Sequence, residues 1–87
     1  MGIVYILRSL VNYRFHIGST NDFKRRLKEH NAGKSKATKF TAPFELVFMQ
    51  EYNSLKEARR VERKLKNLKS KIIIEKIIKE GFIRLGP

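Results

Sequence analysis

The chain contains no cysteine and no tryptophan, and only two of its 87 residues are proline. Without cysteine, disulfide bonds, thiolate metal sites and thiol nucleophiles are excluded. This composition agrees with the reducing cytoplasm, where we expect the protein to reside. No apolar run approaches the length of a membrane span, and the first ten residues lack the basic segment and small-residue cleavage site of a signal peptide.

Acidic residues are also scarce, with eight Asp and Glu against twenty Lys and Arg, a formal charge of +12 and a pI near 10.4. Such an excess repels itself within a compact chain, so it favours an anionic partner. Nucleic acid is our first expectation. An anionic membrane surface is the second, and it is disfavoured because the basic residues are spread along the chain instead of gathered on one amphipathic helix.

The shortage of acids and histidines excludes several catalytic designs. Two histidines cannot make a three-histidine zinc site, and a single aspartate disfavours a Ser-His-Asp triad. Neither a phosphate-loop nor a dinucleotide-binding glycine pattern occurs. Two-metal nuclease chemistry needs several clustered carboxylates, and this chain has too few acidic residues that face inward. If the protein cuts phosphodiesters, it should use one metal ion, an arginine to stabilise charge, and a tyrosine or histidine to move the proton.

The residues that are present suffice for one small domain, since 41% of them are hydrophobic and nine are aromatic. Residues 2–9 are apolar on both faces, which is typical of a central strand. Their pairing with a short strand at 14–18 predicts a hairpin closed near Asn12. We expect a single domain over residues 1–83 and a short tail at 84–87.

The rest of the chain predicts one more strand and three helices. A helix should begin near Asn21, with Thr20 or Asn21 as its cap, and stop before Gly33. A third strand follows at 45–52. Serines then open two further helices, one from a capping box at 54–57 to about residue 68 and one over 71–80. The order β-β-α-β-α-α predicts a small α/β (α+β) sandwich, in which helices flank a three-stranded, mainly antiparallel sheet.

Two residues of the first helix break its amphipathic pattern. Arg26 and His30 are one turn apart and fall on the apolar side, whereas Lys24, Arg25 and Lys28 point towards solvent. One interpretation is a snorkelling arginine beside a core-edge histidine with a satisfied hydrogen bond. The other interpretation is that both residues line a functional site.

The second helix turns a carboxylate inward. Glu62 falls inside the apolar stripe formed by Ala58, Val61 and Leu65. A carboxylate in that position is costly unless it meets a cation, several donors or a metal ion. A salt bridge to one of the twenty basic residues and a metal ligand at the floor of a cleft are both open readings.

Taken in order, these motifs resemble the GIY-YIG nuclease superfamily, and in particular its small stand-alone bacterial members. IVYIL corresponds to the first motif and HIGST to the second. NDFKRRLKEHNAGKS carries the inward arginine and histidine, and SLKEARRVERKLKNLKSK carries the inward glutamate. The match covers nearly the whole chain, and its specificity lies in the ordered set, because no one element is distinctive.

The resemblance implies roles for individual residues. Tyr5, Arg26, His30 and Glu62 would be active-site residues, and Glu62 would bind a single divalent ion, usually Mg2+, with Mn2+ as a substitute. Arg26 would stabilise the pentacovalent phosphate, and a tyrosine would activate or position the attacking water. Thr20, Arg25 and Asn31 would be contacts for nucleic acid.

Two motif positions depart from the family pattern. Ile3 replaces the first-motif glycine, which removes no catalytic side chain. His16 replaces the second-motif tyrosine. An imidazole could accept a proton at neutral pH and so preserve general-base chemistry, or the change could have weakened activity. His16 could also be a half-exposed strand residue without a role.

The loop after the first helix offers further phosphate contacts. Lys34, Lys36 and Lys39 lie there among small hydroxyl residues, without any acid. Such contacts would position a nucleic-acid backbone without reading its sequence, although the segment could equally be an ordinary solvated loop.

From the residues and the resemblance together, the sequence predicts a metal-dependent endonuclease. We expect it to hydrolyse DNA, in preference to RNA, with little sequence specificity, in repair or in the processing of structured DNA. We expect a monomer by default, although a dimer would serve double-strand cutting, and no membrane partner. The main alternative is a nucleic-acid-binding domain that kept the fold and lost turnover. A basic protein-interaction module is a third possibility without a positive signal.

Overall fold

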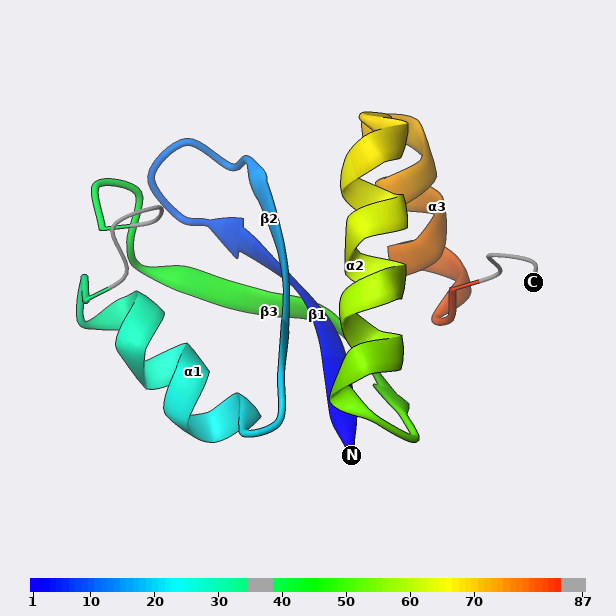
Figure 1. Cartoon of the computed structure of the whole chain (residues 1–87). Helices are drawn as coiled ribbons and strands as arrows, with labels where there is room; N and C mark the ends of the chain where they lie inside the picture. The colour runs from blue at the N-terminus through cyan, green and yellow to red at the C-terminus, as the bar shows by residue number, and fades with distance from the viewer. Residues whose placement is uncertain (35–38, 84–87) are drawn as a thin grey trace.

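The computed structural model describes residues 1–34 and 39–83 of the chain (Figure 1). None of the helices in these ranges is long and apolar enough to cross a membrane. The predicted order β-β-α-β-α-α is confirmed. The elements are β1 (Gly2–Ser9), β2 (Phe15–Thr20), α1 (Phe23–Asn31), β3 (Phe44–Tyr52), α2 (Leu55–Leu68) and α3 (Lys71–Glu80).

The sheet has the strand order β2-β1-β3, and both neighbouring pairs are antiparallel. Residues 2–9 therefore form the central strand, as their apolar pattern on both faces predicts. The sequence predicts a mainly antiparallel sheet, and in the structure both strand pairs are antiparallel. β2 is an edge strand, and α1 and α2 lie on either side of it (Figure 1).

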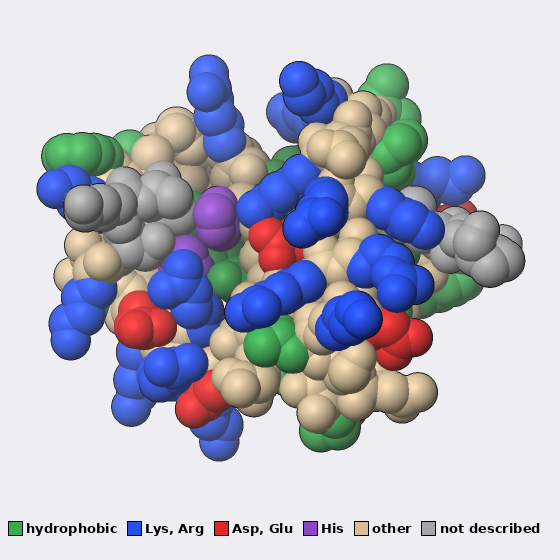
Figure 2. Space-filling model, in the orientation of Figure 1, with side chains coloured by type: hydrophobic (Ala, Val, Ile, Leu, Met, Phe, Trp, Pro, Cys, Tyr) green, Lys and Arg blue, Asp and Glu red, His purple; other side chains and the backbone are tan. Residues whose placement is uncertain are grey.

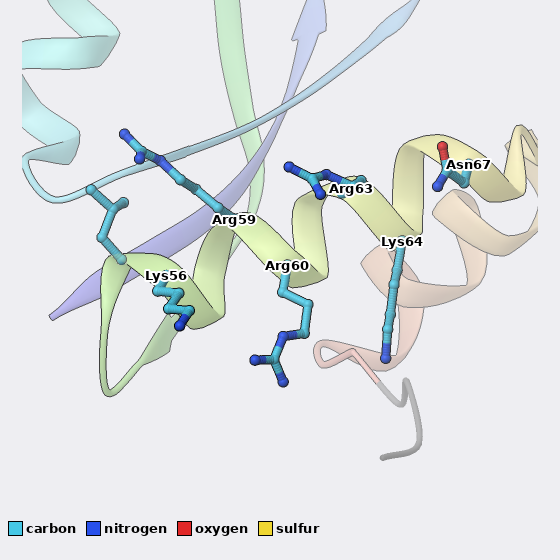
Figure 3. Close-up of a pocket in the computed structure, with 7 residues that line it drawn as sticks. Lys56, Arg59, Arg60, Arg63, Lys64 and Asn67 are labelled. Atoms are coloured by element: carbon cyan, nitrogen blue, oxygen red, sulfur yellow. The ribbon is translucent and has the colours of Figure 1, made fainter.

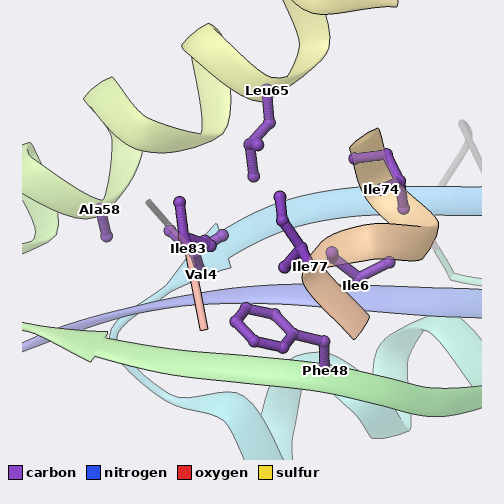
Figure 4. Close-up of a cluster of buried hydrophobic side chains, with 8 residues drawn as sticks. All are labelled: Val4, Ile6, Phe48, Ala58, Leu65, Ile74, Ile77 and Ile83. Carbon is purple, nitrogen blue, oxygen red and sulfur yellow. The ribbon is translucent and has the colours of Figure 1, made fainter. Parts of the chain in front are cut away.

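Each face of β1 packs against a different core. Val4 and Ile6 are fully buried in the larger core, which lies under α2 and α3. Figure 4 shows its buried members: Val4, Ile6, Phe48, Ala58, Leu65, Ile74, Ile77 and Ile83. The smaller core, on the other face, combines Tyr5, Leu7 and Phe44 with the apolar side of α1. The two cores place α1 and α2 on opposite faces of the sheet.

The helix caps follow the sequence signals in α2 and α3. The side chains of Ser54 and Ser70 accept hydrogen bonds from backbone amides in the first turns of α2 and α3, and α3 ends at Gly81, which has φ 84°. The predicted start of α1 is wrong. Its cap is Asp22, not Thr20 or Asn21, because the Thr20 hydroxyl accepts a hydrogen bond from the Asp22 amide and holds 20–22 in a turn.

Candidate active site

Tyr5 lies at the middle of the central strand and is almost completely buried. Its ring covers Gly18, its partner residue on β2. A Cβ atom at Gly18 would lie 2.3 Å from the Tyr5 hydroxyl oxygen, so only glycine leaves room for this ring. The second-motif glycine therefore serves to place a tyrosine of the neighbouring strand.

Helix α1 supplies the hydrogen-bond partner of this tyrosine. The Tyr5 hydroxyl oxygen lies 3.0 Å from Nε2 of His30, which is fully buried in the last turn of α1. The ring of His16 packs edge-on against His30, with 5.0 Å between the ring centres. Two strands and one helix thus bring a phenol and two imidazoles into one cluster.

Arg26 lies one turn before His30 and is partly exposed, with 34% of its side chain accessible. Its guanidinium pairs with Glu29 at 3.5 Å. Arg26 and His30, the two residues of α1 that fall on its apolar side, therefore differ in burial. His30 is a buried, hydrogen-bonded residue, whereas Arg26 keeps access to solvent at the edge of the cluster.

Glu62 reaches β2 from the other side of the sheet. Its carboxylate accepts a hydrogen bond from the hydroxyl of Ser19 and pairs with the ammonium of Lys66 at 2.5 Å. Only 20% of the side chain is exposed. The salt-bridge reading of this inward carboxylate is thus present in the structure, and the cation comes from the same helix.

The site controls the protonation of its members. Burial raises the pKa of Tyr5, opposed by the positive charge of the nearby Arg26. Burial, and next the positive charge of Lys66, lower the pKa of His16. Burial, with the neighbouring His16 and Arg26, lowers the pKa of His30 to about 4. At neutral pH the phenol is protonated and both imidazoles are uncharged.

These pKa values predict a loss of stability in acid. The unfolded chain takes up a proton on His30 near its ordinary pKa of about 6.5, whereas the folded protein does so only near 4. The free energy of unfolding should therefore fall as the pH drops from about 6.5 to 4, by roughly 3 kcal/mol from this residue. Urea unfolding at several pH values measures it.

A His30→Gln variant provides the control for this stability measurement. Glutamine can still donate a hydrogen bond to Tyr5 but does not titrate. We expect the variant to be less stable at pH 7.5 and to lose much of the acid dependence, with the remainder arising from His16. Equal slopes in the two proteins would contradict the buried, neutral state of His30.

The cluster opens into a recess between α1 and α2. Figure 2 shows histidine and an acidic side chain in this recess, flanked by Lys and Arg. A hollow of about 320 Å3 lies at its edge. It is lined by residues of β2, α1 and the first turns of α2: Ser19, Thr20, Asn21, Arg25, Arg26, Glu29, Leu55 and Arg59.

The residues expected to contact nucleic acid have different settings. Arg25 lines the hollow and pairs with Asp22 at 3.8 Å, whereas Lys34 and Lys39 are exposed. The buried Thr20 hydroxyl is bonded to the backbone of the turn before α1. The Asn31 side-chain oxygen accepts a hydrogen bond from the Phe44 amide at 2.8 Å. Thr20 and Asn31 therefore hold the frame of the site. Lys36 lies outside the described residues, as does the 84–87 tail.

A basic surface on α2 was missed by the sequence reasoning. The helix turns five cations to its outer side, where they line a hollow of about 520 Å3 (Figure 3). They are Lys56, Arg59, Arg60, Arg63 and Lys64. Arg59 also lines the hollow at the active-site recess, so the two surfaces are continuous. The signal was present in LKEARRVERKLKNL, which we used only to place Glu62.

The donor set permits one kind of metal site. The described residues contain no group of three or more His, Cys, Asp or Glu that could hold a metal ion. Glu62 nevertheless provides one largely shielded carboxylate beside the recess. Mg2+ commonly binds one or two carboxylates and keeps waters or substrate phosphates as its other ligands. These residues fit such an ion, provided that Lys66 releases the carboxylate.

Comparisons with known proteins identify similar sequences. A family model described as the GIY-YIG catalytic domain matches residues 1–77. The UPF0213 protein YazA of Bacillus subtilis (strain 168) is 38% identical over 65 residues, which cover 70% of this chain and 66% of that protein. The UPF0213 protein SAG0778 of Streptococcus agalactiae is 44% identical over 48 residues, 54% of each chain. The chain thus spans about half to two thirds of the length of these relatives.

A solved structure has the same fold. The solution NMR structure of the UPF0213 protein BH0048 from Bacillus halodurans is 36% identical in sequence and superposes with a TM-score of 0.58. The superposition covers 91% of this chain and 84% of that chain. The predicted three-stranded sheet with its flanking helices is therefore confirmed by an experimental structure as well.

Proposed function

Because this chain belongs to the GIY-YIG catalytic domain family, a family of nucleases that act on nucleic acid, we propose that it is a metal-dependent endonuclease. We infer that it hydrolyses DNA phosphodiester bonds with little sequence preference. The observation that carries this proposal is that Tyr5, His16, Arg26 and Glu62 come from four different elements and lie close enough for the charges of Arg26 and Glu62 to act on both Tyr5 and His16.

The electrostatics support this convergence. The charges of Arg26 and Glu62 both act on Tyr5 and on His16, so the four side chains share one local field. An uncharged imidazole can take the proton of an attacking water, and a protonated phenol can orient that water through its hydroxyl. We assign the proton transfer to His16 and the orientation to Tyr5, which His30 holds in place at 3.0 Å.

Arg26 and Glu62 would act on the phosphate. The partly exposed guanidinium of Arg26 can donate to two oxygens of the phosphate as charge builds up in the transition state. The Glu62 carboxylate would hold the divalent ion. When bound, Mg2+ would polarise the phosphate and stabilise the leaving oxygen. Lys66, which neutralises Glu62 in the structure, would then be free to contact the phosphate backbone.

The outer face of α2 supports binding without sequence recognition. Lys56, Arg59, Arg60, Arg63 and Lys64 lie along one side of the helix and have no ion pair with a described residue. Cations that contact phosphates fix the position of a nucleic acid and carry no sequence information. A strand lying along this face reaches the recess at Leu55 and Arg59, the two residues that line both hollows.

This surface predicts a strong dependence of binding on salt. Replacing both Arg60 and Arg63 with alanine should remove about two phosphate contacts and lower the slope of log K against log salt by about 2. Fluorescence anisotropy with a labelled DNA duplex at 50 to 300 mM salt, in chelator to prevent cleavage, measures the slope. Alanine substitution of Lys76 and Lys79, which are exposed on α3, is the control and should leave the slope unchanged. Equal slopes in both pairs would place the nucleic acid elsewhere.

The competing proposal is a binding domain without turnover. It is favoured by the Glu62–Lys66 ion pair, since a carboxylate neutralised by an ammonium is less available to a metal ion. It is also favoured by His16 in place of the motif tyrosine. The endonuclease is preferred because a protein that only binds a polyanion gains little from an inward carboxylate beside it.

A substrate panel tests the proposal. Labelled single-stranded, duplex, flapped and branched DNA, and RNA, would each be incubated with the protein in Mg2+, Mn2+ or chelator. Metal-dependent cutting of DNA supports the endonuclease, and a preference for flapped or branched DNA supports a role in processing structured DNA. Binding of every substrate without cutting in any metal would instead support the binding domain.

A further inference from the structure

A third hollow is linked to the active site through Lys66, which lines it and pairs with Glu62. It has a volume of about 480 Å3 and lies between the β1–β2 turn and the junction of α2 with α3. Its floor is apolar and consists of Phe15, Ile17, Leu65 and Ile74. In Figure 1 the β1–β2 turn and the C-terminal end of α2 lie at the same end of the molecule.

The rim of this hollow carries four cations and no acid. They are Arg14, Lys66, Lys69 and Lys71. Lys66 pairs with Glu62 at 2.5 Å, so this rim borders the candidate metal ligand directly. Arg14 and Lys69 have no ion pair with a described residue. An apolar floor under a rim whose charged residues are all cations suits a ligand that joins a flat apolar part to an anion.

The backbone is strained on both sides of the hollow. Among the described residues, Tyr13 and Lys69 are the two non-glycine residues with positive φ, at 61° and 49°, and both line it. Such a conformation costs about 1–3 kcal/mol for a residue with a side chain. Tyr13 is 64% exposed, so packing within the protein does little to offset this cost. The strain places an aromatic ring at the mouth of a cationic hollow.

We propose that this hollow binds one unpaired nucleotide of the strand that enters the active site. The base would stack on Tyr13 above the apolar floor, and Arg14 and Lys69 would bind the flanking phosphates. The inference rests on the proposed nuclease function and deepens it, because it makes single-stranded DNA beside the scissile bond part of the substrate. A paired base cannot enter, since its faces are covered by its neighbours in the stack.

The position of the hollow beside the candidate metal ligand favours a nucleotide over an acidic peptide as its occupant. The border residue Lys66 belongs both to this rim and to the Glu62 ion pair, so a continuous strand can occupy both sites. A volume of about 480 Å3 also lies within the range of roughly 300–1,000 Å3 of small-ligand sites. An acidic peptide would not need to bind beside Glu62, whereas a DNA strand that is cut there must pass it.

The test measures binding of the full chain to 2-aminopurine-labelled single strands and to a duplex of equal length, in chelator. Tyr13→Asn removes the ring and tolerates positive φ, and Tyr13→Phe keeps the ring. We expect Tyr13→Asn to weaken single-strand binding about tenfold and to abolish quenching of the probe base, with duplex affinity unchanged within about twofold. Tyr13→Phe should behave as the wild type.

Two further variants keep the test independent of folding. Lys69→Gly removes a cation while relieving the strained backbone, so it should weaken single-strand binding without lowering the melting temperature. Val11→Asn, in the same turn but outside the hollow, should bind as the wild type.

Three results would overturn the inference. If the wild type binds no nucleic acid, the proposed function fails together with it. If the wild type binds but Tyr13→Asn leaves single-strand affinity and quenching unchanged, only the nucleotide site fails. If Tyr13→Asn instead dissolves a dimer or a complex with an acidic peptide, the hollow is a protein-docking site.

Discussion

Replacing Glu62 with glutamine is expected to lower the rate of DNA cleavage on the order of 10³-fold. Glutamine keeps nearly the same shape, and its amide oxygen can still accept the hydrogen bond from Ser19. It lacks the negative charge that would hold a divalent ion at the recess. The loss should therefore appear in the chemical step, measured under single-turnover conditions at saturating enzyme.

The binding of DNA separates this effect from misfolding. In chelator, Glu62→Gln should bind the substrate at least as tightly as the wild type, because the substitution frees Lys66 from its ion pair and removes a negative charge beside a polyanion. Glu57→Gln is a matched control on the same helix, since Glu57 is exposed in the first turn of α2. Full cleavage by Glu62→Gln would show that another group holds the metal.

Gly18→Ala is expected to produce the second large effect, although it adds a single methyl group. That methyl would lie 2.3 Å from the Tyr5 hydroxyl oxygen and 2.4 Å from Cζ, so the buried ring must move and its contact with His30 must break. Overpacking of this kind costs about 1–3 kcal/mol of stability. Displacement of a positioning group by about 1 Å can cost on the order of 100-fold in rate.

Chemical unfolding and cleavage kinetics of Gly18→Ala measure both effects. Gly81→Ala is the control for stability, because it also strains a glycine, at φ 84°, but lies at the end of α3 away from the site. In a Tyr5→Leu background, Gly18→Ala should cost much less stability, since the clashing ring is gone. A cost that is the same in both backgrounds would show that the glycine does not serve Tyr5.

The predictions from sequence succeeded where the signal is local. The capping serines of α2 and α3 act on amides three residues away, and the apolar pattern of β1 reports burial on both faces directly. The start of α1 was misplaced because Thr20, Asn21 and Asp22 are all good capping residues. The choice among them depends on a hydrogen bond between Thr20 and Asp22 that the sequence does not reveal.

The candidate site could be predicted only in part. Helical periodicity brought Arg26, His30 and Glu62 to the correct sides of their helices, but it could not select Lys66 among twenty basic residues as the partner of Glu62. The packing of His16 against His30 depends on how α1 crosses β2, which is a tertiary property. The strained Tyr13 has no sequence signature, since positive φ at a tyrosine contradicts its intrinsic preference.

The central claim is that Glu62 and Arg26 cut a DNA strand together with a divalent ion. The most direct measurement is single-turnover cleavage of end-labelled flapped DNA by the wild type, Glu62→Gln and Arg26→Ala, each in Mg2+ and in chelator. We predict cutting by the wild type in Mg2+ alone, with both variants reduced at least about 100-fold while still binding DNA. Metal-independent cutting, or cutting that both substitutions leave unchanged, would contradict the account.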